Sequence, residues 1–227
     1  FIFEPLIQGA GGMRIYPAET LDAWLEICRR QGVLLIADEV MTGFYRTGKM
    51  FACDYLRIKP DIICLSKGLT GGTLPLGVTA CTEKIFEAFL SNDKRKTFFH
   101  GHSYTANPIA CTAALTSLDI LLTDAYQQQI QHIAAQHQHF LQKLKDYPCF
   151  QHPRQLGTIA AFEVQGDANY TSPLRDTLYL FYLHRGVLMR PLGNTVYVMP
   201  PYCITDEQLQ QIYDATYALG DWLLHKT

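Results

Sequence analysis

A lysine and an aspartate follow two neighbouring predicted strands. Asp38 comes directly after the apolar run Val33–Ala37, and Lys67 comes shortly after the next strand-like run, Asp61–Leu65. Because the carboxyl ends of parallel strands meet at one edge of an open α/β sheet, we expect both side chains at the same ligand-binding edge. A lysine leaving a buried strand is partly desolvated, which makes its amine easier to deprotonate and suits it to Schiff-base formation.

Together, the two residues indicate the chemistry of pyridoxal 5'-phosphate. A carboxylate at this edge holds a pyridinium nitrogen protonated, and the protonated ring then acts as an electron sink. Simpler interpretations of each residue alone stay open: Asp38 as a helix cap or a surface ion-pair partner, and Lys67 as a phosphate-binding or surface lysine. The stretch Lys67–Gly72 is not a P-loop, because its lysine precedes the glycines.

Two further segments carry groups that suit an anionic ligand. His100–Pro108 precedes a long predicted helix, so the hydroxyls of Ser103 and Thr105 and nearby backbone N–H groups are placed to receive a phosphate. A plain N-cap at Asn107 or Thr105 is the alternative. Arg190 ends a predicted strand and suits a carboxylate, which arginine binds through two parallel hydrogen bonds, although an arginine at a strand end is more often a surface residue.

The elements that must position these groups alternate between strand and helix in the first part of the chain. We expect helices over residues 17–30, 82–90, 107–122, 124–145, 172–185 and 205–224, and strands over 1–4, 33–37, 61–65, 76–81 and within 150–164 and 187–199. This order predicts an α/β fold. We expect residues 1–148 to form a mostly parallel sheet with helices, and residues 149–227 to form a small α+β domain.

Composition excludes several classes of protein. Of 227 residues, 48% are hydrophobic, and the net charge is −2, which excludes a mainly disordered chain and gives no support to a nucleic-acid partner. No apolar run approaches the roughly 18–20 residues of a bilayer crossing. The seven cysteines form no CxxC pair, which favours buried thiols in a reducing compartment, the cytoplasm, and no metal site. The histidines of the Gln-rich stretch, His132, His137 and His139, are expected on a solvated helix face.

Four stretches in order resemble the class III (fold type I) pyridoxal-phosphate aminotransferases: EPLIQGAGGM, LLIADEVMTGFYRTGKMFA, PDIICLSKGLTGGTLPLGVT and FFHGHSYTANPIACTAAL. The resemblance covers essentially the whole chain and corresponds to the C-terminal half of such an enzyme. Within the class, the stretches IQGAGGMRIYP, LTGGTLPLGVT, HGHSYTANP and RPLGNTVYVMPPYCIT are most similar to the adenosylmethionine–8-amino-7-oxononanoate aminotransferases of biotin synthesis.

The resemblance implies a role for each site residue. Lys67 corresponds to the lysine that bonds the cofactor and moves the proton, and Asp38 to the partner of the pyridinium nitrogen. Val40 packs against the cofactor ring. Ser103 reaches the cofactor phosphate of the neighbouring subunit. His102 corresponds to a cofactor-binding residue. Gly101 and Arg190 correspond to substrate-binding residues, and Arg190 corresponds to the arginine that binds the substrate carboxylate.

The resemblance also implies an activity and partners. The activity is transfer of an amino group from S-adenosylmethionine to 8-amino-7-oxononanoate, giving 7,8-diaminononanoate, in a homodimer whose site is shared between subunits. Another class III ω-aminotransferase, acting on ornithine, γ-aminobutyrate, a diamine or a β-amino acid, is the alternative. One departure is Tyr45, where relatives usually carry a small residue, often glycine.

The start of the chain shapes a further expectation. Phe1–Pro5 has the pattern of the end of a buried strand and includes no Met, which predicts a fragment. The family also has a loop that binds the cofactor phosphate and a residue that stacks on the second face of the cofactor ring. No residue of this chain is a candidate for either. We therefore expect either a non-catalytic piece or a chain that needs an N-terminal partner.

Overall fold

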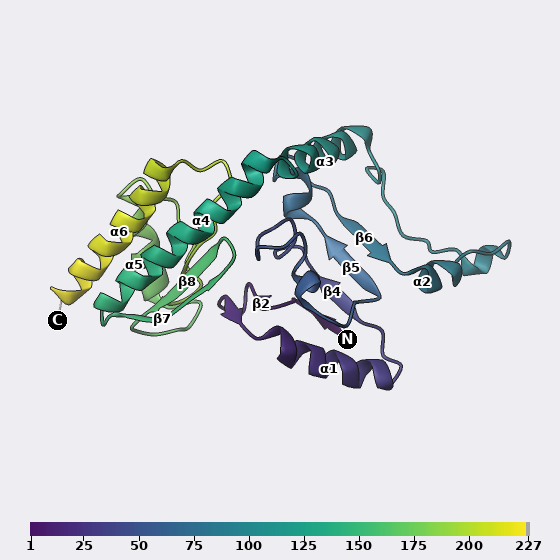
Figure 1. Ribbon diagram of the computed structural model, residues 1–227, viewed down its shortest axis with the longest axis horizontal. Coiled ribbons are helices and arrows are strands. Elements are labelled where there is room, and N and C mark those ends of the chain that lie inside the picture. Colours follow the sequence, from purple (N-terminus) through teal and green to yellow (C-terminus); the bar gives the residue numbers. More distant parts are fainter. Residues whose placement is uncertain (226–227) are drawn as a thin grey trace. The chain divides into compact units, whose positions relative to one another are not determined.

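A four-stranded sheet leads to both residues of the Asp–Lys pair. In the computed structural model, which describes residues 1–225, the strand order is β1-β4-β5-β6 (Figure 1). The strands span Ile2–Phe3, Ile36–Asp38, Ile62–Leu65 and Val78–Cys81. Neighbours β1, β4 and β5 run parallel, and β6 runs antiparallel to β5. The predicted mostly parallel α/β sheet is confirmed, with one antiparallel strand at its end.

Hydrogen bonds of Asp61 connect the residues that directly precede β5 and β4. Its Oδ2 accepts a hydrogen bond from the Leu35 N–H at 2.8 Å, and its own N–H donates to the Leu35 carbonyl at 2.8 Å. The other carboxylate oxygen accepts from Arg29 at 2.6 Å, at the end of helix α1 (Ala18–Arg30). Burial opposes ionisation, but these hydrogen bonds prevail and lower the pKa of Asp61. The resulting register pairs Asp38 with Cys64.

The predicted strand over 33–37 is shorter than expected. Val33 and Leu34 lie outside β4, with 39% and 49% of their surface exposed. β4 pairs with β1 only at Ile36 and Ala37, because β1 itself has two residues. An apolar run of five therefore yields only a short strand, which still ends at Asp38.

The remaining elements of this part of the chain are mostly short. They are the 3₁₀ helices η1 (Ala52–Tyr55), η2 (Lys67–Thr70) and η3 (Lys94–Lys96) and the helices α2 (Glu83–Glu87) and α3 (Pro108–Leu121). Thr82 stands at the N-cap of α2, but its side chain makes no capping hydrogen bond. Asn107 caps α3 by accepting from the Ala110 N–H at 2.9 Å. The segment around α2 extends away from the sheet (Figure 1).

A second sheet, β7-β8-β9, is antiparallel throughout and packs with three helices. The strands are β7 (Phe150–Leu156), β8 (Ile159–Val164) and β9 (Thr195–Val198). The helices are α4 (Asp124–Lys143), continued by η4 (Leu144–Asp146), α5 (Pro173–Leu183) and α6 (Asp206–Leu224), which starts with a capping box at Thr205. The predicted α+β character is confirmed. The hairpin β2 (Ile7–Gln8) and β3 (Arg14–Ile15) belongs to the same compact unit.

The chain divides into two compact units of similar length. The first contains residues 1–6, 16–45 and 49–123, and the second contains residues 7–15, 46–48 and those from Asp124 onward. This division differs from the predicted boundary between residues 148 and 149, because the second unit also includes α4 and η4 and the segments 7–15 and 46–48. The two domains of the sequence interpretation stay a prediction. Residues 226 and 227 of the predicted second domain lie outside the described residues.

His137 corrects the expectation that the Gln-rich helix turns its histidines to solvent. His137 is 0% exposed, while His132 and His139 are exposed as expected. Its spacing from the buried residues Ile133 and Phe140 places it on the apolar stripe of α4. Nε2 donates to the Thr158 carbonyl at 3.1 Å, so Nδ1 is the acceptor for the Tyr213 hydroxyl at 2.7 Å. Burial lowers the pKa of His137 to about 4, which keeps the ring neutral.

The cysteines differ from the expectation of uniformly buried thiols. All seven are free, but only Cys53 is buried, and Cys81 and Cys203 are exposed. Cys53 lies against the Glu39 carboxylate, and burial raises the pKa of its thiol. Among residues 1–225, no single helix has the length and apolar content for a membrane crossing, although the bent pair Pro108–Leu121 and Asp124–Asp146 passes on those criteria together.

Candidate active site

Asp38 stands at the carboxyl end of β4 with one oxygen engaged. Its Oδ1 accepts a hydrogen bond from the Val40 N–H at 3.0 Å, and the side chain is half-buried. The next residue continues the sheet, because the Glu39 N–H donates to the Cys64 carbonyl at 3.0 Å. Within the described residues, Oδ2 of Asp38 has no hydrogen-bond partner, so it is available to a ligand at this edge.

Lys67 opens the 3₁₀ helix η2, three residues after the position that pairs with Asp38. Its φ of +46° is left-handed, which is uncommon for a residue with a side chain. The residue is exposed, so the desolvation expected from the sequence is absent in this chain. No hydrogen bond or ion pair of its amine occurs in the part of the chain that the structure describes. The amine is therefore available as a nucleophile.

These two residues suit pyridoxal phosphate in type and placement. A primary amine and a carboxylate oxygen, each without a partner among residues 1–225, follow adjacent parallel strands at their carboxyl ends. Lys67 would hold the aldehyde carbon, and Asp38 would hold the ring nitrogen. Bound there, the cofactor would supply the electron sink.

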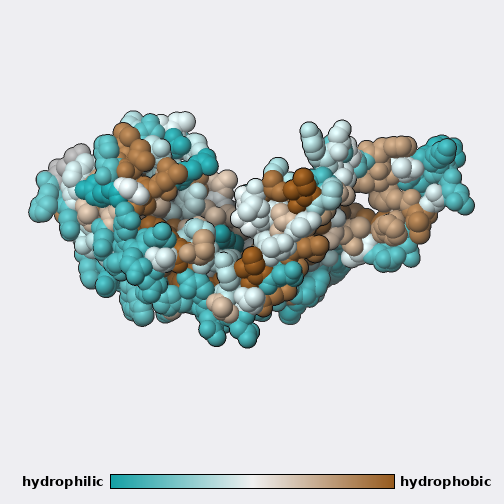
Figure 2. All heavy atoms as spheres, turned by 90° about the horizontal axis from the view of Figure 1, so that it is seen from above, coloured by the Kyte–Doolittle hydropathy of each residue, from teal (hydrophilic) through white to brown (hydrophobic). Residues whose placement is uncertain are grey.

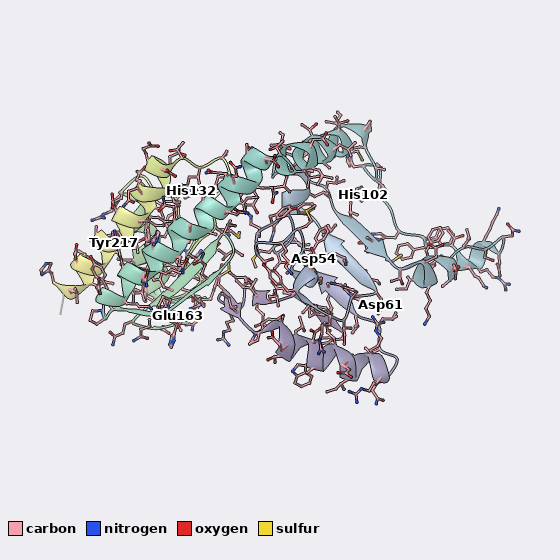
Figure 3. All side chains as sticks on the ribbon, viewed as in Figure 1. Asp54, Asp61, His102, His132, Glu163 and Tyr217 are labelled. Atoms are coloured by element: carbon pink, nitrogen blue, oxygen red, sulfur yellow. The ribbon has the colours of Figure 1, made fainter. Side chains whose placement is uncertain are left out.

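The segment that carries Gly101, His102 and Ser103 forms an exposed turn before α3 (Figure 3). The Thr105 hydroxyl accepts from the His102 N–H at 2.9 Å, and His102 Nδ1 accepts from the Tyr104 N–H at 3.1 Å. Thr105 is thus engaged inside the turn, while the Ser103 hydroxyl has no partner among the described residues. No hydrogen bond joins this turn to Asp38 or Lys67 within residues 1–225.

Arg190 lies in the second unit and is exposed. It was expected at a strand end, but β9 begins only at Thr195. Between them, a tight turn through Gly193, with φ of +61°, brings Leu192 and Thr195 into a β-bridge. The Arg190 guanidinium has no hydrogen bond or ion pair with any described residue, which leaves it available to an anion.

The sequence interpretation missed Glu39. This carboxylate is 0% exposed and accepts hydrogen bonds from the Thr42 hydroxyl and from the N–H groups of Ala52 and Cys53, at 2.6, 3.0 and 2.7 Å. The available signal is the alternation of a strand, because the residue after Asp38 points to the opposite face. Tyr45, the departure from the family pattern, has φ of +67°, a backbone region that favours glycine.

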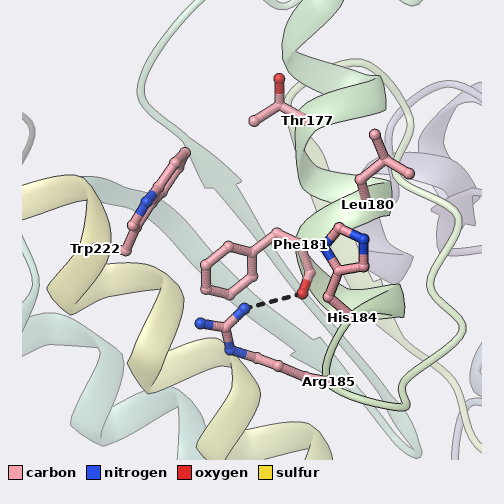
Figure 4. Close-up of a pocket in the computed structure, with 6 residues that line it drawn as sticks. All are labelled: Thr177, Leu180, Phe181, His184, Arg185 and Trp222. Atoms are coloured by element: carbon pink, nitrogen blue, oxygen red, sulfur yellow. Dashed lines mark hydrogen bonds between the residues drawn. The ribbon is translucent and has the colours of Figure 1, made fainter.

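A shallow depression of about 360 Å³ lies elsewhere, on the second unit (Figure 4). It is lined by Thr177, Leu180, Phe181, His184, Arg185 and Trp222. The Arg185 guanidinium packs 3.6 Å above the Phe181 ring and donates to the Phe181 carbonyl at 3.2 Å. None of the predicted site residues lines this depression. Among residues 1–225, no group of three or more His, Cys, Asp or Glu side chains is arranged to hold a metal ion.

Comparison with known proteins gives a consistent result. The sequence profile of the family described as Aminotransferase class-III matches residues 1–218. The adenosylmethionine-8-amino-7-oxononanoate aminotransferase of Synechococcus elongatus is 48% identical over 221 residues, which are 97% of this chain and 52% of that protein. The chain thus spans about half the length of the curated relatives it matches.

Solved structures agree. The crystal structure of adenosylmethionine-8-amino-7-oxononanoate aminotransferase from Methanocaldococcus jannaschii superposes with a TM-score of 0.88 at 37% identity, over 96% of this chain and 52% of its own. A thermostable (S)-enantioselective omega-transaminase from Thermomicrobium roseum gives a TM-score of 0.87 at 32% identity, over 96% of this chain and 49% of its own.

Proposed function

The chain belongs to the class III aminotransferase family, and from this premise we propose that it carries the lysine and aspartate of a transamination site. The family resemblance inferred from the sequence is confirmed, and enzymes of this family use pyridoxal phosphate. The observation that carries the proposal is the pair Asp38 and Lys67 at the carboxyl ends of β4 and β5, with Asp38 Oδ2 and the Lys67 amine free of partners among the described residues.

Each residue has a distinct part in the proposed reaction. Lys67 would hold the aldehyde carbon of the cofactor, and its amine would accept the proton from the donor's Cα. Asp38 would hold the ring nitrogen through Oδ2, while its Oδ1 keeps the hydrogen bond from the Val40 N–H. Val40 packs against the ring. In the second half of the reaction, Lys67 returns the proton to the acceptor carbon.

The proposed donor is S-adenosylmethionine and the proposed acceptor is 8-amino-7-oxononanoate. The support is the similarity to relatives named for this activity, at up to 48% identity. Arg190 binds the acceptor carboxylate, and Gly101 lines the substrate site. The exposed turn with His102 and Ser103 serves the cofactor phosphate, in a homodimer whose site is shared between subunits or together with an N-terminal partner. Seven free thiols fit the proposed location in the cytoplasm.

The test is amino transfer by the full-length protein with each candidate donor and acceptor. Lys67→Ala abolishes transfer with every substrate. Arg190→Ala raises the KM for 8-amino-7-oxononanoate, because loss of a desolvated charge pair costs on the order of 2–5 kcal/mol, and leaves cofactor content unchanged. Transfer by Lys67→Ala would remove the lysine from the site, and an unchanged KM would remove Arg190.

A second candidate is another class III ω-aminotransferase, favoured by the similarity to the Thermomicrobium roseum enzyme. The substrates of this second candidate are ornithine, γ-aminobutyrate, diamines or β-amino acids. Because the catalytic pair is the same, only the substrate panel separates the two candidates. Faster transfer to or from one of these amines than to 8-amino-7-oxononanoate assigns the second candidate.

A further inference from the structure

Phe44 and Glu39 have no role in the reaction described so far, yet Phe44 lies against the residue that follows Lys67, and Glu39 holds the loop that carries Phe44. Building on the proposed function, we propose that Phe44 is a positioning residue for Lys67 and that Glu39 holds Phe44 in place. The steps of the argument run from the Glu39 carboxylate through the loop to the peptide that follows Lys67.

Glu39 closes the loop that contains Phe44. Its buried carboxylate accepts from the Thr42 hydroxyl at 2.6 Å at one end of the loop. At the other end it accepts from the N–H groups of Ala52 and Cys53, at 3.0 and 2.7 Å. Its carbonyl accepts from the Gly43 N–H at 3.0 Å. Charged acceptors make the stronger hydrogen bonds, so one side chain fixes both ends of the loop.

Phe44 is the part of the loop that reaches the lysine segment. It is 6% exposed, and its ring meets the ring of Phe51 edge-on, with centroids 5.9 Å apart. A Cβ built on Gly68 lies 2.9 Å from Phe44 Cδ2 and 3.1 Å from its Cβ. Only a residue without a side chain fits at this distance. The peptide after Lys67 therefore rests directly on the Phe44 side chain.

The backbone on both sides of this contact is unusual. Lys67 has φ of +46° and Phe44 has φ of +59°, and neither is a glycine. Left-handed residues with side chains persist only where the surroundings hold them. A reacting amine must be oriented closely, since a misplacement of about 1 Å can cost on the order of 100-fold in rate. The contact of Phe44 with Gly68 is the feature that fixes the direction in which Lys67 leaves the sheet.

The experiment measures where pyridoxal phosphate attaches. The full-length protein is incubated with pyridoxal phosphate, reduced with borohydride and digested, and the labelled fraction at Lys67 is divided by that at Lys49 in the same sample. The variants are Gly68→Ala and Phe44→Leu. Gly77→Ala is the matched control, because a Cβ there meets only the Leu65 carbonyl at 3.8 Å.

We expect Gly68→Ala to lower the Lys67 to Lys49 ratio about tenfold, within the range that misplacement of a reacting group produces. Gly77→Ala leaves it unchanged. A loss of folding in Gly68→Ala is detected by circular dichroism, and Phe44→Leu alone then decides, with an expected fall in the ratio.

Two different failures are distinguishable. A ratio that stays at the wild-type value in Gly68→Ala and in Phe44→Leu overturns the positioning role and leaves the proposed function standing. No preference for Lys67 in the wild-type chain defeats the proposed function itself, and the positioning role with it.

Discussion

The two compact units differ in where they keep their apolar side chains. Of the 24 exposed large hydrophobic side chains in the described residues, 19 lie in the first unit and five in the second. The main cluster of buried apolar residues lies wholly in the second unit, around Phe140 and Phe162. Figure 2 shows that hydrophobic side chains reach the surface of the molecule, and most of the large exposed ones belong to the first unit.

This difference bears on the proposed function. An exposed apolar surface of this extent is typical of an interface, and the first unit also carries Asp38 and Lys67. The second unit buries its own core, whereas the first offers its apolar side chains to another surface. We propose that a second subunit or an N-terminal partner covers them, and four predictions test the contrast.

The largest effect is expected in the core of the second unit. Phe162 is 0% exposed, and its ring centroid lies 4.9 Å from the ring centroid of Phe150 and 6.2 Å from that of Phe140. Phe162→Ala should lower the free energy of unfolding by about 3–5 kcal/mol, because it leaves a cavity. Urea unfolding followed by Trp222 fluorescence, in a Trp24→Phe background, measures it.

The matched substitution in the first unit is Leu115→Ala on α3, where the side chain is 65% exposed. It should change the free energy of unfolding by less than about 0.5 kcal/mol. Equal losses for Phe162→Ala and Leu115→Ala would contradict the contrast between the units.

Two glycines with similar backbone conformations, one in each unit, extend the comparison between the units. Gly157 has φ of +55° and Gly72 has φ of +81°. A Cβ on Gly157 lies 2.5 Å from the Arg46 carbonyl oxygen, whereas a Cβ on Gly72 meets nothing within 4 Å. Gly72→Ala should cost about 1 kcal/mol for the left-handed backbone. Gly157→Ala should cost about 1–3 kcal/mol more, because backbone must move. Thermal unfolding that ranks the two variants in the opposite order refutes this prediction.

Acid should weaken the second unit through His137. The pKa of His137 falls from 6.5 to about 4 on folding, so below pH 6.5 the unfolded chain binds more protons than the folded one. Stability is lost as the pH falls from about 6.5 to about 4, by up to about 3 kcal/mol. Urea midpoints across this range measure the loss. His137→Gln should remove this part of the pH dependence, while His139→Gln, at an exposed position, should keep it.

Sequence patterns predicted those features that depend on local periodicity and chain order. α1, α3 and α6 lie within about two residues of their predicted ends, because capping residues and apolar spacing set them locally. The edge that unites Asp38 with the Lys67 segment was predictable as well, because parallel strands share an orientation. The position of Arg190 before a tight turn was missed, although Pro191, Gly193 and Asn194 are residues typical of a turn before the late start of β9.

Long-range contacts account for what the sequence did not predict. His137 is held by Thr158 and Tyr213, which are 21 and 76 residues away in the chain. Because the neighbours of His137 in the sequence are polar, the sequence analysis wrongly predicted that its side chain is exposed. The contact between Phe44 and Gly68 likewise joins a loop and η2, which become neighbours only when β4 pairs with β5.

The smallest effect on stability, with a clear effect on association, is expected at Phe99, which is 85% exposed in the first unit. Phe99→Ser should leave the free energy of unfolding within about 0.5 kcal/mol of wild type and weaken self-association. Sedimentation velocity over a concentration series measures the association. Leu188→Ser, at a 71% exposed position of the second unit, is the control and should not change it. Equal weakening by both substitutions would remove the distinction between the surfaces.

The most direct test of the site is to locate the residue that pyridoxal phosphate modifies in the full-length protein. Borohydride reduction followed by peptide mapping should place the cofactor on Lys67, and Asp38→Asn should leave that attachment possible while abolishing transfer, because the ring nitrogen loses its carboxylate. Labelling of Lys49 or Lys84 with Lys67 unmodified would contradict the assignment of Lys67 and Asp38 as the catalytic pair.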